Sequence, residues 1–310
     1  MINTRVRRVR PRWLALGLVA VMVALVGVAW AARPDAVASL FDRDLPSAVA
    51  GQVPPRITEA PVVRIAAAGD TGTGDAVARA TAGRMVEQGG QHPYDALVLL
   101  GDLIYEDGDA ALVEPMVSDP FAGVVDGGAE LLPVLGNHDY HSGEQREILR
   151  ELGRASAWYV ERVGPVRIIV LDSNRVQDRE QQRWLRATLA QPQPPGSWTV
   201  AAMHHPAYSA GYHGSDLAVR GSWGPLFAAA GIPLVLAGHD HDYQRSTPQD
   251  GVTYVVSGAG AKLRAAGRED FTAVSTSTLH YLDLLVYPDR LVGRAIDQAG
   301  ALVDTFTITR

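Results

Sequence analysis

Short apolar segments recur between Val62 and Val256, and they constrain the fold more than any other feature. Several, such as Ala96–Leu100, are continuous rather than alternating, which is typical of strands buried on both faces. Segments with helical periodicity lie between them, so the chain is expected to adopt an α/β architecture. The predicted strands are Val62–Ala68, Ala96–Leu100, Leu131–Leu135, Val166–Leu171, Trp198–Met203, Ile232–Ala237 and Val252–Val256, and the predicted helices are Asp75–Gln88, Glu144–Leu152, Asp178–Leu189 and Val219–Ala230.

One catalytic domain is expected over residues 61–310. A chain of 310 residues with 47% hydrophobic residues can bury one large core. Residues 34–60 contain several prolines and no sustained periodicity, so they are predicted to be a flexible linker. Beyond Leu279, three apolar runs are separated by turn-forming residues, which predicts an antiparallel meander at the C-terminus.

The first 33 residues differ from the rest and predict a membrane-engaging segment. Five arginines between Arg5 and Arg12 precede Trp13–Ala32, which carries no charge. Twenty residues at about 1.5 Å each match a hydrocarbon core of about 30 Å. Two interpretations stay open: an uncleaved anchor at residues 13–32 with a cytoplasmic N-terminus, or a signal peptide cleaved near Ala31. Both place the domain outside the cytosol, and the length of the apolar run favours the anchor.

Charge and cysteine content exclude some classes of function. The chain has 28 basic and 34 acidic residues, and residues 1–33 hold six of the basic ones and none of the acidic ones. The remainder therefore carries a net charge of about −12, which argues against sequence-independent nucleic-acid binding but not against a small phosphorylated substrate. Cysteine is absent, so a thiolate metal site and a cysteine nucleophile are both excluded.

Polar residues that can bind metal ions follow five of the predicted strands. One Gly-Asp pair after a strand is more often a turn or a helix cap, but five such clusters in order favour a metal site. Ligands bind beyond the carboxyl ends of strands in α/β sheets, so the clusters are expected to converge. Their oxygen and imidazole donors suit Fe, Mn or Zn, and a carboxylate can bridge two cations. The expected ligands are Asp70, Asp102, Tyr105, Asn137, His204, His239 and His241.

The five clusters, from Val62 to Arg245, resemble those of the calcineurin-like metallophosphoesterases, and within them the purple acid phosphatases. The superfamily has Asp-x-His in its first motif, whereas Asp70-Thr71-Gly72 lacks the histidine, as purple acid phosphatases do. Those enzymes have a tyrosine three residues after the bridging aspartate, and Tyr105 follows Asp102 at this spacing. The resemblance implies a four-layer αββα sandwich of two mixed β-sheets flanked by helices.

The resemblance also implies two metal ions bridged by Asp102. Fe(III) is expected at Asp70, Asp102, Tyr105 and His241, because phenolate and carboxylate are hard anionic donors. The second ion, which would be Fe(II), Zn(II) or Mn(II), is expected at Asp102, Asn137, His204 and His239.

Catalytic roles follow from the same resemblance. His138 is expected to be the general acid that protonates the leaving oxygen, with Asp139 as its orienting partner. His213 is expected to be a second histidine on the substrate side. His205 is expected either to support a metal ligand without binding the metal itself or to have a purely structural role. A metal-held hydroxide would attack phosphorus, and an acidic pH optimum would follow if His138 must be protonated.

Three functions remain open from the sequence. The first is an exported or membrane-anchored hydrolase of phosphate monoesters, favoured by Tyr105 and by the absence of histidine at Gly72. The second is a phosphodiesterase of the same superfamily that acts on nucleotides or phospholipid head groups. The third is a non-catalytic extracellular binding module, which the complete set of ligand residues disfavours. The oligomeric state is not predicted.

Overall fold

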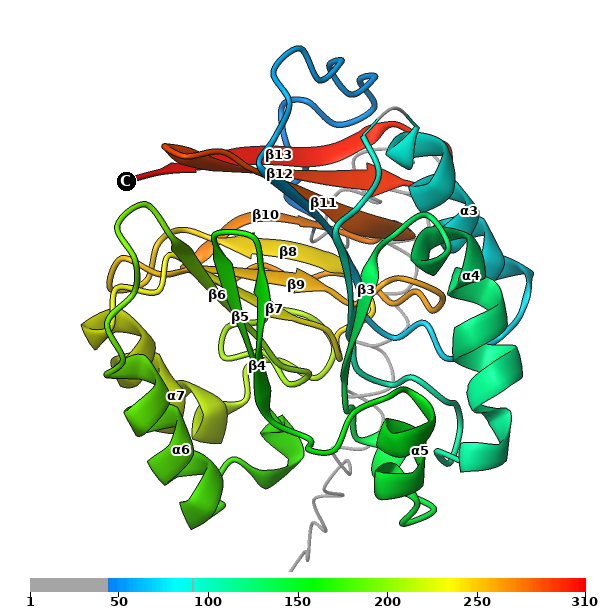
Figure 1. Ribbon diagram of the computed structural model, residues 1–310. Helices are drawn as coiled ribbons and strands as arrows, with labels where there is room; N and C mark the ends of the chain where they lie inside the picture. The colour runs from blue at the N-terminus through cyan, green and yellow to red at the C-terminus, as the bar shows by residue number, and fades with distance from the viewer. Residues whose placement is uncertain (1–43, 91) are drawn as a thin grey trace, which may run out of the picture. The chain divides into compact units, whose positions relative to one another are not determined.

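Two mixed sheets, each with a run of parallel strands, form the core of the fold in the computed structural model, which describes residues 44–90 and 92–310 (Figure 1). The first sheet has the strand order β13-β12-β11-β1-β2-β3, in which β1, β2 and β3 are parallel and the other pairs are antiparallel. Its strands are β1 (Val63–Ala68), β2 (Ala96–Leu100), β3 (Glu130–Val134), β11 (His280–Val286), β12 (Arg290–Asp297) and β13 (Leu302–Thr309).

The second sheet has the strand order β10-β8-β9-β7-β6-β5-β4. Strands β5, β6, β7 and β9 run parallel, and antiparallel strands close both edges. Its strands are β4 (Tyr159–Val163), β5 (Val166–Val170), β6 (Trp198–Ala202), β7 (Leu234–Ala237), β8 (Tyr243–Ser246), β9 (Thr253–Ser257) and β10 (Thr272–Thr276).

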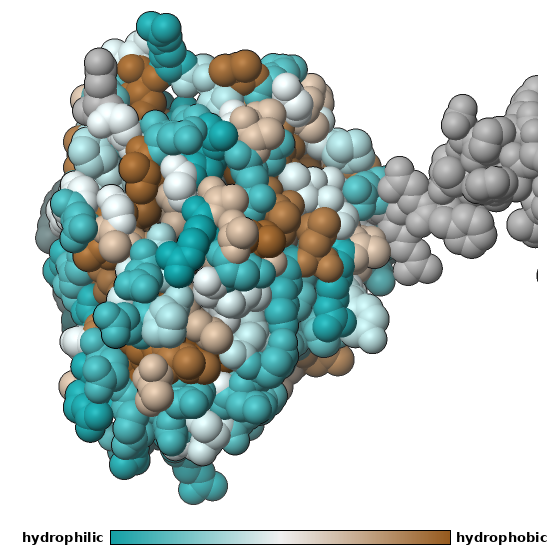
Figure 2. Space-filling view, turned by 90° about the vertical axis from the view of Figure 1, so that its right-hand side faces the viewer, coloured by the Kyte–Doolittle hydropathy of each residue, from teal (hydrophilic) through white to brown (hydrophobic). Residues whose placement is uncertain are grey.

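Three apolar clusters separate four layers and confirm the predicted αββα sandwich. The central cluster joins the two sheets and includes Val98 of the first and Val200 of the second. A second cluster packs the first sheet against α3 (Ala76–Gly89), α4 (Asp119–Val125) and α5 (Gln145–Glu151). A third packs the other sheet against α6 (Arg179–Leu189) and α7 (Leu217–Ala229). Around α3 and α4 the surface is mainly hydrophilic, with hydrophobic residues scattered over it (Figure 2).

Most predicted elements are present, with small differences in their bounds. Asp75 and Asp178 accept hydrogen bonds from backbone N–H groups in the first turns of α3 and α6, which explains where these helices begin. The predicted C-terminal meander is present as β11–β13, and it extends the first sheet beside β1. Strands β4, β8 and β10 and helix α4 were not predicted, because they are short and lack a clear apolar period.

Residues 44–60, the second half of the predicted linker, contact the first sheet and the edge strand β10. The N–H of Gly51 donates to the carbonyl of Leu302 at 2.8 Å, and the N–H of Leu302 donates to Gln52 at 2.7 Å. Leu45 pairs with Ser275 in the same way. The predicted membrane segment, residues 13–32, lies outside the described residues. None of the helices within residues 44–90 and 92–310 is long and apolar enough to cross a membrane.

Candidate metal centre

The carboxyl ends of parallel strands from both sheets converge at one place. Asp70 and Asp102 follow β1 and β2 of the first sheet, and His239 follows β7 of the second. All three have positive φ angles, of 59°, 51° and 73°, in a region that non-glycine residues rarely occupy. Backbone strain of this kind concentrates at functional sites, because the surrounding structure must maintain it.

Three glycines allow the proposed ligand side chains to pack directly against the backbone. A Cβ atom at Gly136 would lie 2.1 Å from Oδ1 of Asp102, and one at Gly101 would lie 2.3 Å from Nδ1 of His204. A Cβ atom at Gly238 would lie 2.7 Å from Oδ2 of Asp70. Any larger residue at these three positions would displace a proposed metal ligand, so the glycines help to form the site.

Asp102 lies at the centre of the site, with one carboxylate oxygen towards each of two groups of side chains. Its Oδ2 accepts a hydrogen bond from the Tyr105 hydroxyl at 3.0 Å. Its Oδ1 lies 3.4 Å from Nε2 of His204. We call the group of Asp70, Tyr105 and His241 the tyrosine side, and the group of Asn137, His204, His205 and His239 the histidine side.

The tyrosine side is compact and rich in oxygen. The Tyr105 hydroxyl lies 3.1 Å from Oδ1 of Asp70 and 3.3 Å from Nε2 of His241. The same His241 nitrogen lies 3.3 Å from Oδ1 of Asp70. Asp70, Asp102 and His241 each offer one ligand atom within 4.8 Å of the other two, and all three side chains are buried.

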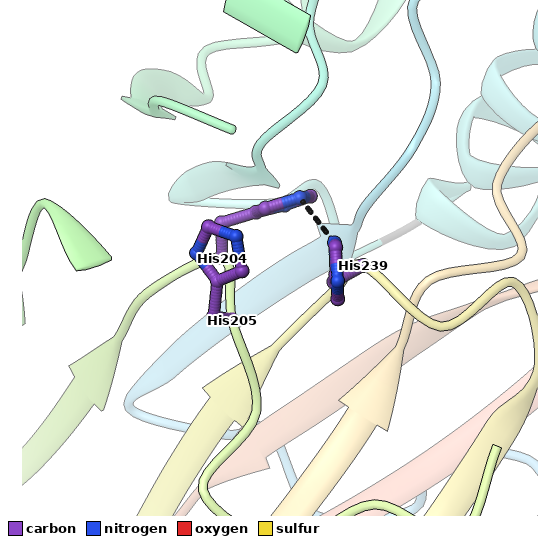
Figure 3. A group of neighbouring side chains, drawn as sticks. All are labelled: His204, His205 and His239. Atoms are coloured by element: carbon purple, nitrogen blue, oxygen red, sulfur yellow. Dashed lines mark hydrogen bonds between the residues drawn. The ribbon is translucent and has the colours of Figure 1, made fainter. Parts of the chain in front are cut away.

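The histidine side brings three imidazoles together from the ends of β6 and β7 (Figure 3). Nε2 of His204 lies 3.2 Å from Nδ1 of His239 and 3.1 Å from Oδ1 of Asn137. His205 also belongs to this group, because a ligand atom of its ring lies within 4.8 Å of those of His204 and His239. The sequence left the role of His205 open, since its nearness to His239 depends on the packing of β6 against β7.

The donor set fits bound cations. Nδ1 of His204 lies 2.8 Å from the carbonyl oxygen of Leu100, and a carbonyl only accepts, so Nδ1 carries the proton. Nε2 is then an electron-pair donor, and it faces oxygens of Asn137 and Asp102. Such electron-rich atoms repel one another unless a positive charge lies among them. The hydrogen bond to Leu100 fixes the tautomer in the way that is common for metal-binding histidines.

Burial shifts the protonation of the individual groups. It raises the pKa of Asp70 well above the usual range, and it lowers the pKa of His241 to about 4 and that of His205 to about 3. Burial also raises the pKa of Tyr105, and the carboxylates of Asp70 and Asp102 raise it further. A cation beside the tyrosine would have the opposite effect, because it stabilises the phenolate.

His138 lies at the edge of the site with one nitrogen fixed. Its Nδ1 lies 2.6 Å from the carbonyl oxygen of Glu106, so Nδ1 donates and Nε2 remains to gain or lose a proton. Nε2 lies 4.0 Å from Oδ2 of Asp102, and the side chain is 25% exposed. The ring packs edge-on against Tyr105 with centroids 4.6 Å apart. His138 is therefore accessible to a substrate that reaches the metal ligands.

Asp139 does not orient His138, contrary to the expectation from the sequence. Its buried carboxylate accepts hydrogen bonds from the N–H groups of Leu103, Ile104 and Gly136 at 2.7–3.1 Å. These bonds join the loop after β2 to the loop after β3. Asp139 thus maintains the positions of the loops that carry Asp102 and Asn137.

His213 lies beside the histidine side. Its ring centroid is 4.4 Å from that of His239. Its N–H donates to Oδ1 of Asp240 at 2.7 Å, and Asp240 also accepts from Gly214 and Ser209. Buried Asp240 therefore anchors the loop that carries His213. The role of His213 towards a substrate stays a prediction.

The structure adds two residues that the sequence did not indicate. Nζ of Lys262 lies 3.4 Å from the centroid of the Tyr105 ring and 2.8 Å from a carboxylate oxygen of Glu106. The Glu106 carboxylate in turn lies 3.7 Å from Nδ1 of His138. Lys262 and Glu106 are 156 residues apart, and no local pattern marks either of them.

Comparisons with known proteins agree with this geometry. A sequence model described as calcineurin-like phosphoesterase matches residues 63–243. A cAMP/cGMP dual specificity phosphodiesterase of Mycobacterium tuberculosis (strain CDC 1551 / Oshkosh) is 31% identical over 243 residues, which cover 71% of this chain and 72% of the relative. Purple acid phosphatase 3 of Arabidopsis thaliana is 24% identical over 230 residues, which cover 64% and 63%.

The same fold occurs in solved structures. Purple acid phosphatase PPD1 from yellow lupin (Lupinus luteus) seeds has a TM-score of 0.69 at 17% identity, over 83% of this chain and 55% of that chain. The matched region spans less than two thirds of several curated relatives: 63% of the Arabidopsis protein and 21% of an uncharacterized protein of Mycobacterium tuberculosis.

Proposed function

The chain belongs to the calcineurin-like phosphoesterase family, and we propose that it hydrolyses phosphate monoesters with two metal ions, outside the cytosol. The proposal rests on the position of Asp102. One oxygen of its carboxylate faces the tyrosine side and the other faces the histidine side. A carboxylate in this position suits a bridge between two cations. The substrate would be a small phosphorylated molecule rather than a nucleic acid.

The two sides would hold different ions. Asp70, Tyr105 and His241 would bind the first ion and Asn137, His204 and His239 the second, with Asp102 shared. The phenol and carboxylates favour Fe(III) on the tyrosine side, and the neutral donors suit Fe(II), Zn(II) or Mn(II) on the histidine side. Bound cations of this kind polarise a phosphate ester and lower the pKa of water.

The protein residues would then handle protons and orientation. The hydrogen bond from Nδ1 of His138 to the Glu106 carbonyl holds the ring, so that Nε2 can deliver a proton to the leaving oxygen. The Glu106 carboxylate lies 3.7 Å from the same Nδ1. His213, beside His239, would contact the same substrate from the histidine side.

A phosphodiesterase is the second candidate function, because the 31% identical relative is named a cAMP/cGMP dual specificity phosphodiesterase. Rates on p-nitrophenyl phosphate and bis(p-nitrophenyl) phosphate, measured side by side with protein loaded with Fe, Zn or Mn, separate the two functions. We expect faster turnover of the monoester. Faster turnover of the diester would favour the phosphodiesterase, and no hydrolysis of either by metal-loaded protein would favour a non-catalytic binding module.

The proposed location rests on residues 13–32, whose apolar length suits a membrane span. Protease treatment of intact cells should digest the domain in either case, because both an anchor and a cleaved signal peptide place it outside. N-terminal sequencing of the mature protein then distinguishes the two: an intact N-terminus indicates the anchor, and a start after Ala31 indicates cleavage. A domain protected from protease in intact cells would contradict export.

A further inference from the structure

A row of side chains in contact extends outward from the histidine side of the metal site. The ring centroid of His213 lies 4.4 Å from that of His239, and the ring centroid of Tyr212 lies 5.0 Å from that of His213. The guanidinium carbon of Arg264 lies 4.3 Å from the centroid of the Tyr212 ring. We call His213, Tyr212 and Arg264 the outer row. Tyr212 is 71% exposed, so a molecule bound at the site can also contact this row.

Backbone hydrogen bonds fix the outer row relative to the proposed metal ligands. The N–H of Arg264 donates to the carbonyl of His241 at 2.8 Å. The N–H of His213, next to Tyr212, donates to Oδ1 of buried Asp240 at 2.7 Å. Both loops are therefore tied to the short segment after β7 that carries two of the proposed ligands.

The charge of Arg264 is not neutralised by another side chain. Its guanidinium group stacks on Tyr212, and none of its N–H donors has a hydrogen bond or an ion pair within the described part of the chain. Lys262, two residues earlier, pairs instead with Glu106 at 2.8 Å. Burial lowers the pKa of His241, and the charges of Arg264 and Lys262 lower it further, so both cations act on the metal site. Arg264 is the one of these two whose donors are unused.

We propose that Arg264 determines specificity by binding a carboxylate on the leaving group of a phosphate monoester. This inference rests on the proposed function and names its substrate class. The ester phosphate lies at the metal ligands, and the leaving group extends past His213 along the outer row. The guanidinium group matches carboxylate oxygens with two parallel N–H donors, and one uncompensated cation matches one negative charge. The exposed Tyr212 ring provides apolar surface for the carbon skeleton between the two anionic groups.

Two aryl phosphates that differ in one charge test the proposal. 4-Carboxyphenyl phosphate carries the carboxylate, and 4-carbamoylphenyl phosphate is a neutral analogue of nearly the same shape. The metal-loaded wild type should have a kcat/KM for the carboxylate ester at least about tenfold above that for the amide ester. Arg264→Gln should bring this ratio to about one. The matched control Arg268→Gln removes an exposed arginine of the same loop, which donates to the Asp44 carbonyl, and should keep the wild-type ratio.

A charge-reversed variant separates direct contact from a structural role. Arg264→Glu should reverse the preference, so that 4-(aminomethyl)phenyl phosphate is hydrolysed faster than 4-carboxyphenyl phosphate. Equal slowing of both esters would indicate a disturbed loop and would contradict the contact. A wild-type ratio of about one, or a ratio that Arg264→Gln leaves unchanged, would overturn the inference.

Binding of two phosphonates separates failure of this inference from failure of the proposed function, because a phosphoesterase does not hydrolyse their carbon–phosphorus bond. Calorimetric titration of the metal-loaded wild type should show 4-carboxybenzylphosphonate binding at least about tenfold more tightly than 4-carbamoylbenzylphosphonate. Arg264→Gln should bind both equally. If neither aryl phosphate is hydrolysed, the proposed function fails and the phosphonates alone decide the inference. Equal affinities in the wild type, or no binding of either phosphonate, would then overturn it.

Discussion

The two sides of Asp102 differ in charge, and this difference is the basis for proposing that they bind different ions. The tyrosine side offers a phenol and a second buried carboxylate, Asp70, beside a single imidazole. The histidine side offers imidazoles and the neutral Asn137 amide. Negative oxygen donors stabilise a trivalent ion more than neutral nitrogen donors do. The tyrosine side is therefore expected to bind the trivalent ion and the histidine side a divalent ion.

Removing the shared carboxylate tests the comparison most strongly. Asp102→Asn should lower metal content on both sides, because the bridging charge is lost. We expect a loss of about 4 kcal/mol in transition-state stabilisation, or about 10³-fold in kcat/KM. Asparagine tolerates the positive φ at this position, so the variant should fold. Metal analysis with hydrolysis rates checks this, and full occupancy of both ions would contradict a shared ligand.

Replacing His138 tests whether this histidine, at the edge of the metal site, takes part in catalysis without binding a metal ion. His138→Ala should reduce kcat by about 10²-fold, as loss of a general acid does, and should leave the metal content nearly unchanged. His141→Ala is the matched control, because this neighbouring histidine lies 3.1 Å from the same Glu106 carbonyl and is 48% exposed. Wild-type turnover of His138→Ala would rule out the general acid.

His239→Asn acts on the histidine side alone. Asparagine is chosen because it accommodates the φ of 73°. The variant should weaken binding of the second ion by at least about tenfold, while the ion on the tyrosine side remains. Metal titration followed by elemental analysis measures both. Loss of both ions in this variant would show that the two sides do not fill independently.

Tyr105→Phe acts on the tyrosine side and is expected to have the smallest effect on rate. If iron binds through the Tyr105 oxygen, the wild type has a visible charge-transfer band that disappears in this variant, and the histidine side keeps its ion. The phenyl ring can retain the edge-on contact with His138. Absorption spectra measure the band, with Tyr212→Phe, an exposed tyrosine, as the control. A colourless, iron-free, active wild-type enzyme would refute Fe(III) on this side.

The sequence by itself determined the order of most strands and helices, and the polar residues that follow five of the strands. Apolar runs such as Ala96–Leu100 are local patterns, and Asp102 and Tyr105 are three residues apart, so both are legible without a structure. The five clusters were expected to converge because parallel strands end at the same edge of a sheet. The structure links all seven proposed ligands through contacts of 3.0–3.4 Å between neighbouring side chains.

Only the tertiary structure decided how the proposed ligands divide into a tyrosine side and a histidine side, and which residues surround them. The N–H of His239 donates to Asp70 at 2.8 Å across 169 residues, and Lys262 reaches Glu106 across 156. Asp139 joins two loops instead of orienting His138. Such contacts depend on the packing of one sheet or loop against another, and sequence spacing carries no information about these distances.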